Sequence, residues 1–292
     1  MIGKNIKKSL NAKMKDWLKN VDNDDIKKTI MENAIITGGS IVSMLNNEEV
    51  NDYDVYFRTQ DAVIKITNYY VAKFNENHKN IAEVKVSDDT GRVSIFIQSA
   101  GTASENNGVT DESEPTPFKE PSDEKTNAEP ELKPKYRPVY LSSNAITLSD
   151  KIQIIIRFYG EPKEIHENYD FVHCTCYWTS WNNELCLPSR ALEAIINKEL
   201  YYMGSKYPLC SIIRTRKFIN RGDTINAGQY LKMALQLNQL DLLNVDTLED
   251  QLMGVDSAYF AAAIRSIKER QTSEPEWKLD DGYLFEIINR IF

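Results

Sequence analysis

Cysteine and histidine are both scarce, with four cysteines and three histidines among 292 residues. The cysteines show neither the spacing of a secreted disulfide framework nor a Cys-x2-Cys pair. They are Cys174, Cys176, Cys186 and Cys210. A zinc site built from His173 and these cysteines is disfavoured, because alternation along a strand puts His173 on the face opposite Cys174 and Cys176. We therefore expect buried structural cysteines.

Long apolar runs are also missing, and we expect no signal peptide. A membrane span needs about 18 consecutive apolar residues or more, so no membrane partner is expected. We expect a soluble protein of a reducing compartment, the cytoplasm. An excess of basic residues is lacking too, since the formal net charge is -8. A nucleic-acid partner would therefore have to contact a local basic patch.

One stretch combines a short apolar run, two glycines and a serine. Residues 34–36 are typical of a buried strand, and Gly38-Gly39 permits positive φ and the close approach of a ligand to bare backbone. Ser40 begins an expected short helix whose N-terminal amides face whatever lies over the glycines. Free N–H groups and the helix dipole both favour an anion, so we expect a phosphate here.

Two aspartates follow on an expected strand, at Asp52 and Asp54. Strand residues two apart point the same way, so both carboxylates share one face. Mg²⁺ typically takes a few carboxylates and completes its shell with substrate phosphate oxygens. The stretch therefore predicts a site for Mg²⁺ or Mn²⁺ beside the phosphate. The alternative is a glycine turn followed by an edge strand with solvated aspartates.

Gly38, Gly39, Ser40, Asp52 and Asp54 resemble the signature of the nucleotidyltransferase superfamily, which includes DNA polymerase β and the CCA-adding tRNA enzymes. The run that follows Gly39 is most similar to the CCA-adding branch. The resemblance implies an α+β fold, with a polymerase β-like head of mixed sheet and flanking helices and an all-helical C-terminal part. It also implies a nucleoside triphosphate such as ATP, a divalent cation and an RNA acceptor. The compact head with an acidic insert also resembles nucleotidyltransferase-fold proteins of large bacteriophages.

Enzymes of this superfamily need a third carboxylate on a strand beside the Asp-x-Asp strand, and Tyr169-Asp170-Phe171 resembles the aromatic-Asp-aromatic pattern found there. Residues 168–178 are rich in β-branched and aromatic residues, which favours a strand. Asp170 thus joins Asp52 and Asp54 as a candidate catalytic and metal-binding residue. The alternatives are a strand-start or helix-cap role for Asp170, or Asp150 in its place.

Basic residues gather on an expected helix over 209–220. Arg214, Lys217 and Arg221 fall at i, i+3 and i+7 on one face, where they can grip a triphosphate or an RNA backbone. The segment resembles the Arg-x-x-Arg-Phe…Gly neck of the CCA-adding enzymes, with Lys217 in place of the second arginine and Asp223 in place of an aromatic. Arg214 and Lys217 are therefore candidate nucleotide-binding residues. A solvated basic helix face is the alternative.

Periodicity divides the chain into N-terminal helices over 1–33, a head over 34–180 and a helical domain over 186–292. Within the head, residues 100–135 are acidic and nearly free of large apolar side chains, so we expect a disordered insert. Residues 151–158 are apolar throughout, and both strand and helix remain open there. We expect strands over 81–86, 92–98 and 144–148, and helices over 4–19, 24–33, 61–75, 162–168, 189–203, 224–237, 247–253, 257–269 and 281–291.

The expected reaction is the transfer of a nucleoside monophosphate from a nucleoside triphosphate to a hydroxyl acceptor, in the first place a tRNA-like RNA 3′ end. One alternative is nucleotidylation of a protein or a small molecule, as a toxin would perform it. A second is a non-catalytic binding or structural protein, for instance a virion-associated phage protein, that retains the fold.

Overall fold

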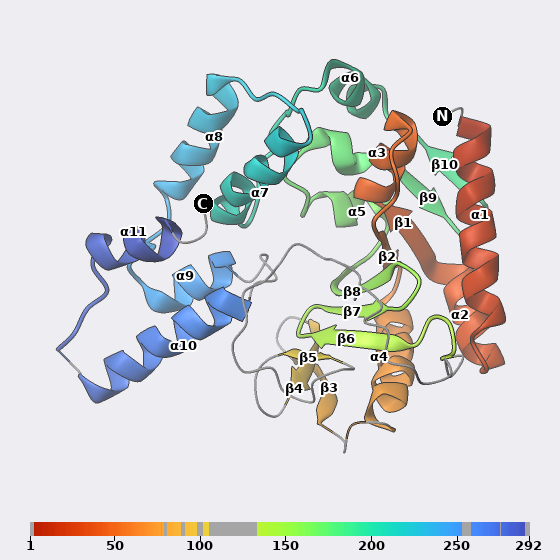
Figure 1. Ribbon diagram of the computed structural model, residues 1–292, viewed down its shortest axis with the longest axis horizontal. Helices are drawn as coiled ribbons and strands as arrows, with labels where there is room; N and C mark the ends of the chain where they lie inside the picture. The colour runs from red at the N-terminus through yellow and green to blue at the C-terminus, as the bar shows by residue number, and fades with distance from the viewer. Residues whose placement is uncertain are drawn as a thin grey trace, which may run out of the picture. The chain divides into compact units, whose positions relative to one another are not determined.

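The computed structural model describes residues 3–76, 78, 81–88, 91–97, 102–104, 133–252, 258–274 and 276–289 (Figure 1). The chain divides into two compact units. The first contains Met1–Ile165 and Cys176–Leu187, and the second contains His166–Thr175 and Pro188–Phe292. The N-terminal helices therefore belong to the same unit as the sheet, whereas His166–Thr175, which we expected in the head, belongs to the helical unit.

A mixed sheet forms the centre of the first unit, and its eight described strands follow the order β10-β9-β1-β2-β8-β7-β6-β5. All pairs are antiparallel except β2 with β8, which is parallel. The sheet strands are β1 (Ala34–Thr37), β2 (Tyr53–Phe57), β5 (Thr102–Ser104), β6 (Pro138–Ser142), β7 (Ala145–Leu148), β8 (Ile152–Tyr159), β9 (Tyr177–Thr179) and β10 (Glu184–Cys186). A separate hairpin pairs β3 (Ala82–Val86) with β4 (Val93–Ile97). This arrangement confirms the expected α+β class.

Helices flank this sheet, and α1 (Gly3–Lys19) contacts its β10 edge (Figure 1). The side chains that α1 buries recur at helical spacing, as the sequence predicts: Ile6, Leu10, Met14 and Trp17. Asn23 caps the next helix, because its side chain accepts hydrogen bonds from the N–H groups of residues 25 and 26. The further helices of this part are α2 (Asp24–Asn33), α3 (Gly39–Asn46), α4 (Gln60–Asn75) and α5 (Pro162–His166).

Residues 151–158 lie almost entirely in a strand, which settles the choice between strand and helix. Ile152, Ile154 and Ile156 of β8 are buried, while the residues between them are half-buried. Alternation of this kind is the period of two that a strand imposes on its side chains. β8 therefore has one fully covered face and one that is partly open.

The second unit is mainly helical. A 3₁₀ turn, η1 (Val172–Thr175), contacts α6, and two apolar clusters form the core, one around Leu248 and Ile267 and the other around Phe171 and Tyr202. The helices are α6 (Ser189–Asn197), α7 (Pro208–Asn220), α8 (Ala227–Leu237), α9 (Val245–Leu252), α10 (Ala258–Ser273) and α11 (Asp281–Asn289). This confirms a helical C-terminal part.

The expected strand over 168–178 is wrong for most of its length. Only β9, at its end, is a strand, and the preceding residues form η1. Phe171 is fully buried against Leu200, Tyr202 and Met233, and it forms an isolated bridge with Tyr202. Burial in this cluster therefore overrides the local β propensity, as tertiary packing often does.

Two helices of the second unit also differ from expectation. α6 ends at Asn197, because Lys198 adopts a left-handed conformation with φ of 52°. α8 begins at Ala227 and not at Thr224, and it exposes Leu231 and Leu235 while Gln229 and Met233 are buried. The buried amide of Gln229 is satisfied there, since its Oε1 accepts a hydrogen bond from the backbone N–H of Tyr202.

The expectation of disorder over 100–135 is wrong at residues 102–104, which form β5. β5 pairs with β6, and Tyr136, just past the far end, is only 3% exposed. Residues 105–132 lie outside the described residues. Among the described helices, none has the length and apolar character that crossing a bilayer requires.

Candidate functional site

The turn between β1 and α3 has backbone geometry that requires glycine. Gly38 has φ of 84° and ψ of -142°, in a region that side-chain-bearing residues rarely adopt. Gly39 begins α3, and a Cβ placed there would meet no described heavy atom within 4 Å. A ligand can therefore approach the backbone at Gly39 directly. Gly38 has no side chain to cap α3, so its first amides retain their capacity to bind an anion.

Ser40 carries an unsatisfied hydroxyl at the start of α3. The residue is 2% exposed, and its Oγ has no hydrogen-bond partner among the described residues. Most buried polar groups are paired, so an orphaned hydroxyl points to a missing partner. A phosphate oxygen over the glycines is a partner of suitable chemistry.

The pairing of β1 with β2 brings the aspartates to this turn. Asp54 lies directly opposite Thr37, the last residue before the glycines. Opposed residues of an antiparallel pair have Cα atoms about 4.5–5.5 Å apart and share a face. The register ends at this pair, because the chain turns at Gly38 and α3 begins at Gly39, while Asp52 lies in the loop directly before β2. Asp52 is exposed and Asp54 is half-buried.

On its other side, β2 pairs with β8, which aligns Gln153 with Asp54. Thr37, Asp54 and Gln153 thus form one row across three strands, on the face opposite the buried Val55. β8 is described along its whole length and carries no carboxylate. This neighbour of β2 therefore supplies an amide level with Asp54, and Asp170, the expected third carboxylate, lies on neither of the two strands that pair with β2.

Asp52 and Asp54 suit a hard cation such as Mg²⁺, which uses one or two carboxylates and completes its octahedral shell with water and substrate phosphate oxygens. Within the described ranges, no three His, Cys, Asp or Glu side chains gather closely enough to hold a metal ion. The donor set therefore fits an ion that arrives with a nucleotide better than a resident ion. Binding of Mg²⁺ or Mn²⁺ here stays a prediction.

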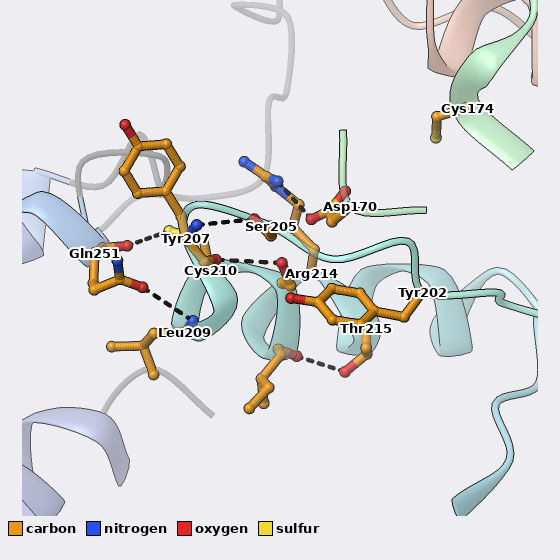
Figure 2. A network of polar contacts seen from close by, with 12 residues as sticks. Asp170, Cys174, Tyr202, Ser205, Tyr207, Leu209, Cys210, Arg214, Thr215 and Gln251 are labelled. Carbon is orange, nitrogen blue, oxygen red and sulfur yellow. Dashed lines mark hydrogen bonds and ion pairs between the residues drawn. The ribbon is translucent and has the colours of Figure 1, made fainter. Parts of the chain in front are cut away.

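Asp170 lies in the second unit and is bound to an arginine. Its Oδ2 accepts a hydrogen bond from Arg214 Nη1 at 2.6 Å, and Figure 2 shows the guanidinium of Arg214 pointing toward this carboxylate. The Asp170 side chain is 8% exposed and that of Arg214 is 38% exposed. The pair comes from the segment before η1 and from α7, not from a strand. Roles for Asp170 as a third metal ligand and for Arg214 in nucleotide binding stay predictions.

The remaining basic residues of α7 differ in setting. Lys217 is exposed in the last turn of the helix, and Arg221 is half-buried at its C-cap. A cation near a helix C-terminus is favoured by the helix dipole, which accounts for both positions without a ligand. Nucleotide binding by Lys217 therefore also stays a prediction.

His173 and Cys176 are both buried. Burial lowers the pKa of His173 to about 4 and raises the pKa of Cys176 to about 12, so both are neutral at pH 7. His173 belongs to the second unit and Cys176 to the first. Cys176 and Cys210 are buried, whereas Cys174 and Cys186 are half-buried, so the expectation of buried cysteines is confirmed for two of the four.

Sequence reasoning missed two residues next to the aspartates. Thr37 is fully buried, and its Oγ1 donates to the carbonyl of Cys176 at 2.9 Å, which ties the end of β1 to β9. Lys151 binds the loop that carries Asp52. No short-range motif marks either residue, because each acts on a segment distant in sequence.

The chain is similar to two solved structures of CCA-adding enzymes. The Bacillus stearothermophilus enzyme in complex with CTP matches with a TM-score of 0.38 and 11% identity, covering 79% of this chain and 47% of that one. The Thermotoga maritima enzyme complexed with tRNA matches with a TM-score of 0.39 and 10% identity, covering 91% of this chain and 55% of that one. The likeness is coarse, and no residue role is carried over from it.

Gabija anti-defense 2 of Bacillus phage SPbetaL7 is a curated relative of this chain. It is 20% identical over 268 residues, which cover 89% of this chain and 52% of the relative. The chain thus spans about half the length of that relative. The model of the Gabija anti-defense 2 family matches residues 8–198, which is more than half of the chain. The chain belongs to the Gabija anti-defense 2 family.

Proposed function

We propose that the first unit binds a nucleoside triphosphate at the β1–α3 turn and transfers a nucleoside monophosphate to a hydroxyl acceptor. The observation that carries the proposal is the pairing of Asp54 with Thr37, which sets the carboxylate of Asp54 beside a glycine turn that is open to a ligand, with Asp52 two residues before it. The unpartnered hydroxyl of Ser40 supports it, because a phosphate oxygen would satisfy that group.

Each residue of the site has a role in the proposal. The amides from Gly39 onward and the Ser40 hydroxyl hold the β- and γ-phosphates, while Asp52 and Asp54 fix the divalent cation that accompanies the nucleotide. When bound, that cation activates the attacking hydroxyl and neutralises charge on the leaving pyrophosphate. The protein then contributes mainly by positioning the reactants and by preorganised electrostatics.

The acceptor follows from two lines of support. The signature of the first unit resembles that of the CCA-adding branch, which favours an RNA 3′ end. The curated relative is named for an action against Gabija defence. We therefore propose that this protein also acts against Gabija defence. We propose further that it does so by transferring a nucleotide to an RNA. A protein of the defence system is the alternative acceptor.

The test uses the full-length protein, Mg²⁺ and each of the four nucleoside triphosphates labelled at the α-phosphate. Reactions contain either tRNA or a cell extract, with label in RNA or protein and release of pyrophosphate as readouts. The double variant Asp52→Asn with Asp54→Asn should abolish labelling. Asp61→Asn is the matched control, because Asp61 is exposed in the first turn of α4.

Label in RNA supports the RNA acceptor, and label in protein supports the alternative. Activity that survives the double asparagine change would remove the two carboxylates from the reaction. Loss of activity in Asp61→Asn as well would show that the loss is a general effect of removing carboxylates.

A second candidate is a protein that binds the nucleotide without transferring it. The observation that favours it is Gln153, which occupies the position on β8 in register with Asp54 and has no negative charge to offer a second cation. Such a protein would counter the defence system by sequestering a nucleotide.

Isothermal titration with a nucleoside triphosphate and Mg²⁺, run beside the pyrophosphate assay, separates the two candidates. Binding without any pyrophosphate release, in the presence of tRNA and of extract, favours sequestration. Replacing Gln153 by Glu then tests whether the missing charge is what limits transfer.

A further inference from the structure

The loop between α3 and β2 carries Asp52, and its first residues are bonded back to α3, where the N–H of Glu48 donates to the carbonyl of Ser43 at 2.8 Å. Asn47 ends α3 in a left-handed conformation with φ of 60°. From there to Asp52 every residue is exposed except Val50, which is half-buried. An exposed loop without apolar anchors samples many conformations, and ordering it costs conformational entropy. Some other contact must therefore fix the direction of Asp52.

Lys151 makes contacts on both sides of Asp52. Its Nζ donates to the carbonyl of Val50 at 3.2 Å and pairs with Glu49 Oε1 at 2.7 Å. Its own carbonyl accepts a hydrogen bond from the backbone N–H of Tyr53 at 2.8 Å. One residue thus binds the chain immediately before and immediately after Asp52 and its neighbour Asn51.

The backbone of the β7–β8 turn has an unusual conformation that allows these contacts. Asp150 and Lys151 both adopt positive φ, 62° and 63°. A left-handed lysine is uncommon and persists where surrounding contacts determine it. Those contacts include Lys13 of α1, whose Nζ donates to the carbonyl of Asp150, and the backbone N–H of Tyr136, which donates to Asp150 Oδ2 at 3.3 Å.

The same support reaches the start of β2. Lys13 lies over the ring of Tyr53, with its Nζ 5.2 Å from the centroid, and over the ring of Tyr136 at 4.9 Å. Tyr53 points to the face opposite Asp54, since neighbouring strand residues alternate. Lys13 therefore contacts β2 on the face opposite Asp54. Lys151 contacts the loop that precedes β2.

We propose that Lys151 is the positioning residue of the two-aspartate site, because its ammonium binds residues 49 and 50, its carbonyl binds residue 53, and together they fix the loop that carries Asp52 next to β2. It acts through the bond to the Val50 carbonyl more than through Glu49, whose side chain is 82% exposed and therefore well screened. This inference rests on the proposed function for what Asp52 binds. The hold of Lys151 on the loop is independent of it.

Amide hydrogen exchange of the loop 47–53 tests the hold directly, in full-length protein without a nucleotide. Lys151→Met removes the ammonium and keeps the side-chain length, and we expect exchange in this loop to accelerate about tenfold, because a charge-assisted hydrogen bond is lost. Lys151→Arg should restore protection. Lys65→Met is the matched control, because Lys65 pairs with Asp25 on the surface of the same unit.

Titration with Mn²⁺ alone, followed by electron paramagnetic resonance, tests the consequence for the site. We expect Lys151→Met to weaken Mn²⁺ binding about tenfold, a loss of one charge-assisted contact, while Lys151→Arg and Lys65→Met bind as the wild type does. Loop exchange that is unchanged in Lys151→Met would overturn the positioning role.

The two proposals fail in different ways. If the wild type binds no Mn²⁺, the proposed function loses its cation while the exchange experiment still decides the role of Lys151. If Lys151→Met loosens the loop and Mn²⁺ binding stays as tight as in the wild type, the proposed function stands and Lys151 does not position Asp52.

Discussion

Arg214 Nη1 lies 2.6 Å from Asp170 Oδ2, and the carboxylate of this pair is almost fully buried. Asp170 belongs to the segment before η1, and Arg214 belongs to α7, so the pair joins two distant stretches of the second unit. A buried carboxylate that loses its cation is costly, because its desolvation is no longer compensated.

Arg214→Met should therefore destabilise the protein. Breaking a fully buried pair costs about 3–5 kcal/mol, and we expect about 2 kcal/mol or more here, because Arg214 is 38% exposed. Urea denaturation followed by circular dichroism measures the change. Adding Asp170→Asn should recover part of the loss, since no unpaired charge is then buried. An unchanged midpoint in Arg214→Met would show that the pair contributes nothing to stability.

The two glycines of the β1–α3 turn should respond differently to alanine. Gly38→Ala is expected to destabilise the protein by about 1 kcal/mol or more, because φ of 84° strains a residue with a Cβ. Gly39→Ala should fold at least as well as the wild type, since its Cβ meets nothing within 4 Å. It should nevertheless weaken nucleotide binding, because the methyl group occupies the approach to the backbone. Thermal melting and nucleotide titration of both variants separate the two effects.

A hydrogen bond between α1 and α4 anchors the N-terminal helix. Trp17 Nε1 donates to Tyr70 Oη at 2.7 Å, and both residues are buried. Tyr70→Phe leaves the indole N–H without a partner, so we expect a loss of about 1–3 kcal/mol in the free energy of unfolding. Tyr69→Phe is the comparison, because Tyr69 Oη instead binds Asp22 at an exposed position. Equal losses in both variants would contradict the role of burial.

Stability should fall in mild acid because of His173. Burial lowers its pKa to about 4, whereas an unfolded histidine titrates near 6.5. The unfolded chain therefore binds a proton between these pH values that the folded chain does not, and stability present above pH 6.5 is lost as the pH falls toward 4. His173→Phe should flatten this dependence by up to about 3 kcal/mol.

Denaturation midpoints at several pH values from 7 to 4 measure the slope. The phenyl ring suits the site, since His173 already packs edge-on against Phe218, with ring centroids 4.6 Å apart. Burial also lowers the pKa of His166 to about 4, so its replacement should act in the same direction. A slope that His173→Phe leaves unchanged would assign the acid sensitivity to other groups.

Local patterns predicted the elements on which the candidate site stands. The expected helices α1, α2 and α4 and the expected strands β3 and β4 are confirmed, because each is encoded within a few residues. The position of the glycine turn and of the Asp-x-Asp strand follows from the same kind of signal.

Long-range packing decided the rest. The residues around Phe171 have a strand composition but are buried among helices of the second unit. In α8, Gln229 and Met233 are buried because the first accepts a hydrogen bond from Tyr202 and the second packs in the cluster with Phe171. Lys151 could not be predicted as a neighbour of Asp52, since their proximity depends on the parallel pairing of β2 with β8. A parallel pair leaves no short-range signature, because a long connection separates its strands.

The first unit is built from two separate stretches of the chain, which limits how it can be produced as a shorter fragment. Residues 166–175 leave the first unit, and Cys176–Leu187 returns to it with β9 and β10. A fragment cut at residue 165 would thus expose the backbone of β1, the strand that leads into the glycine turn, and invite edge-to-edge aggregation. A minimal version must either splice residue 165 to residue 176 or retain the whole polypeptide.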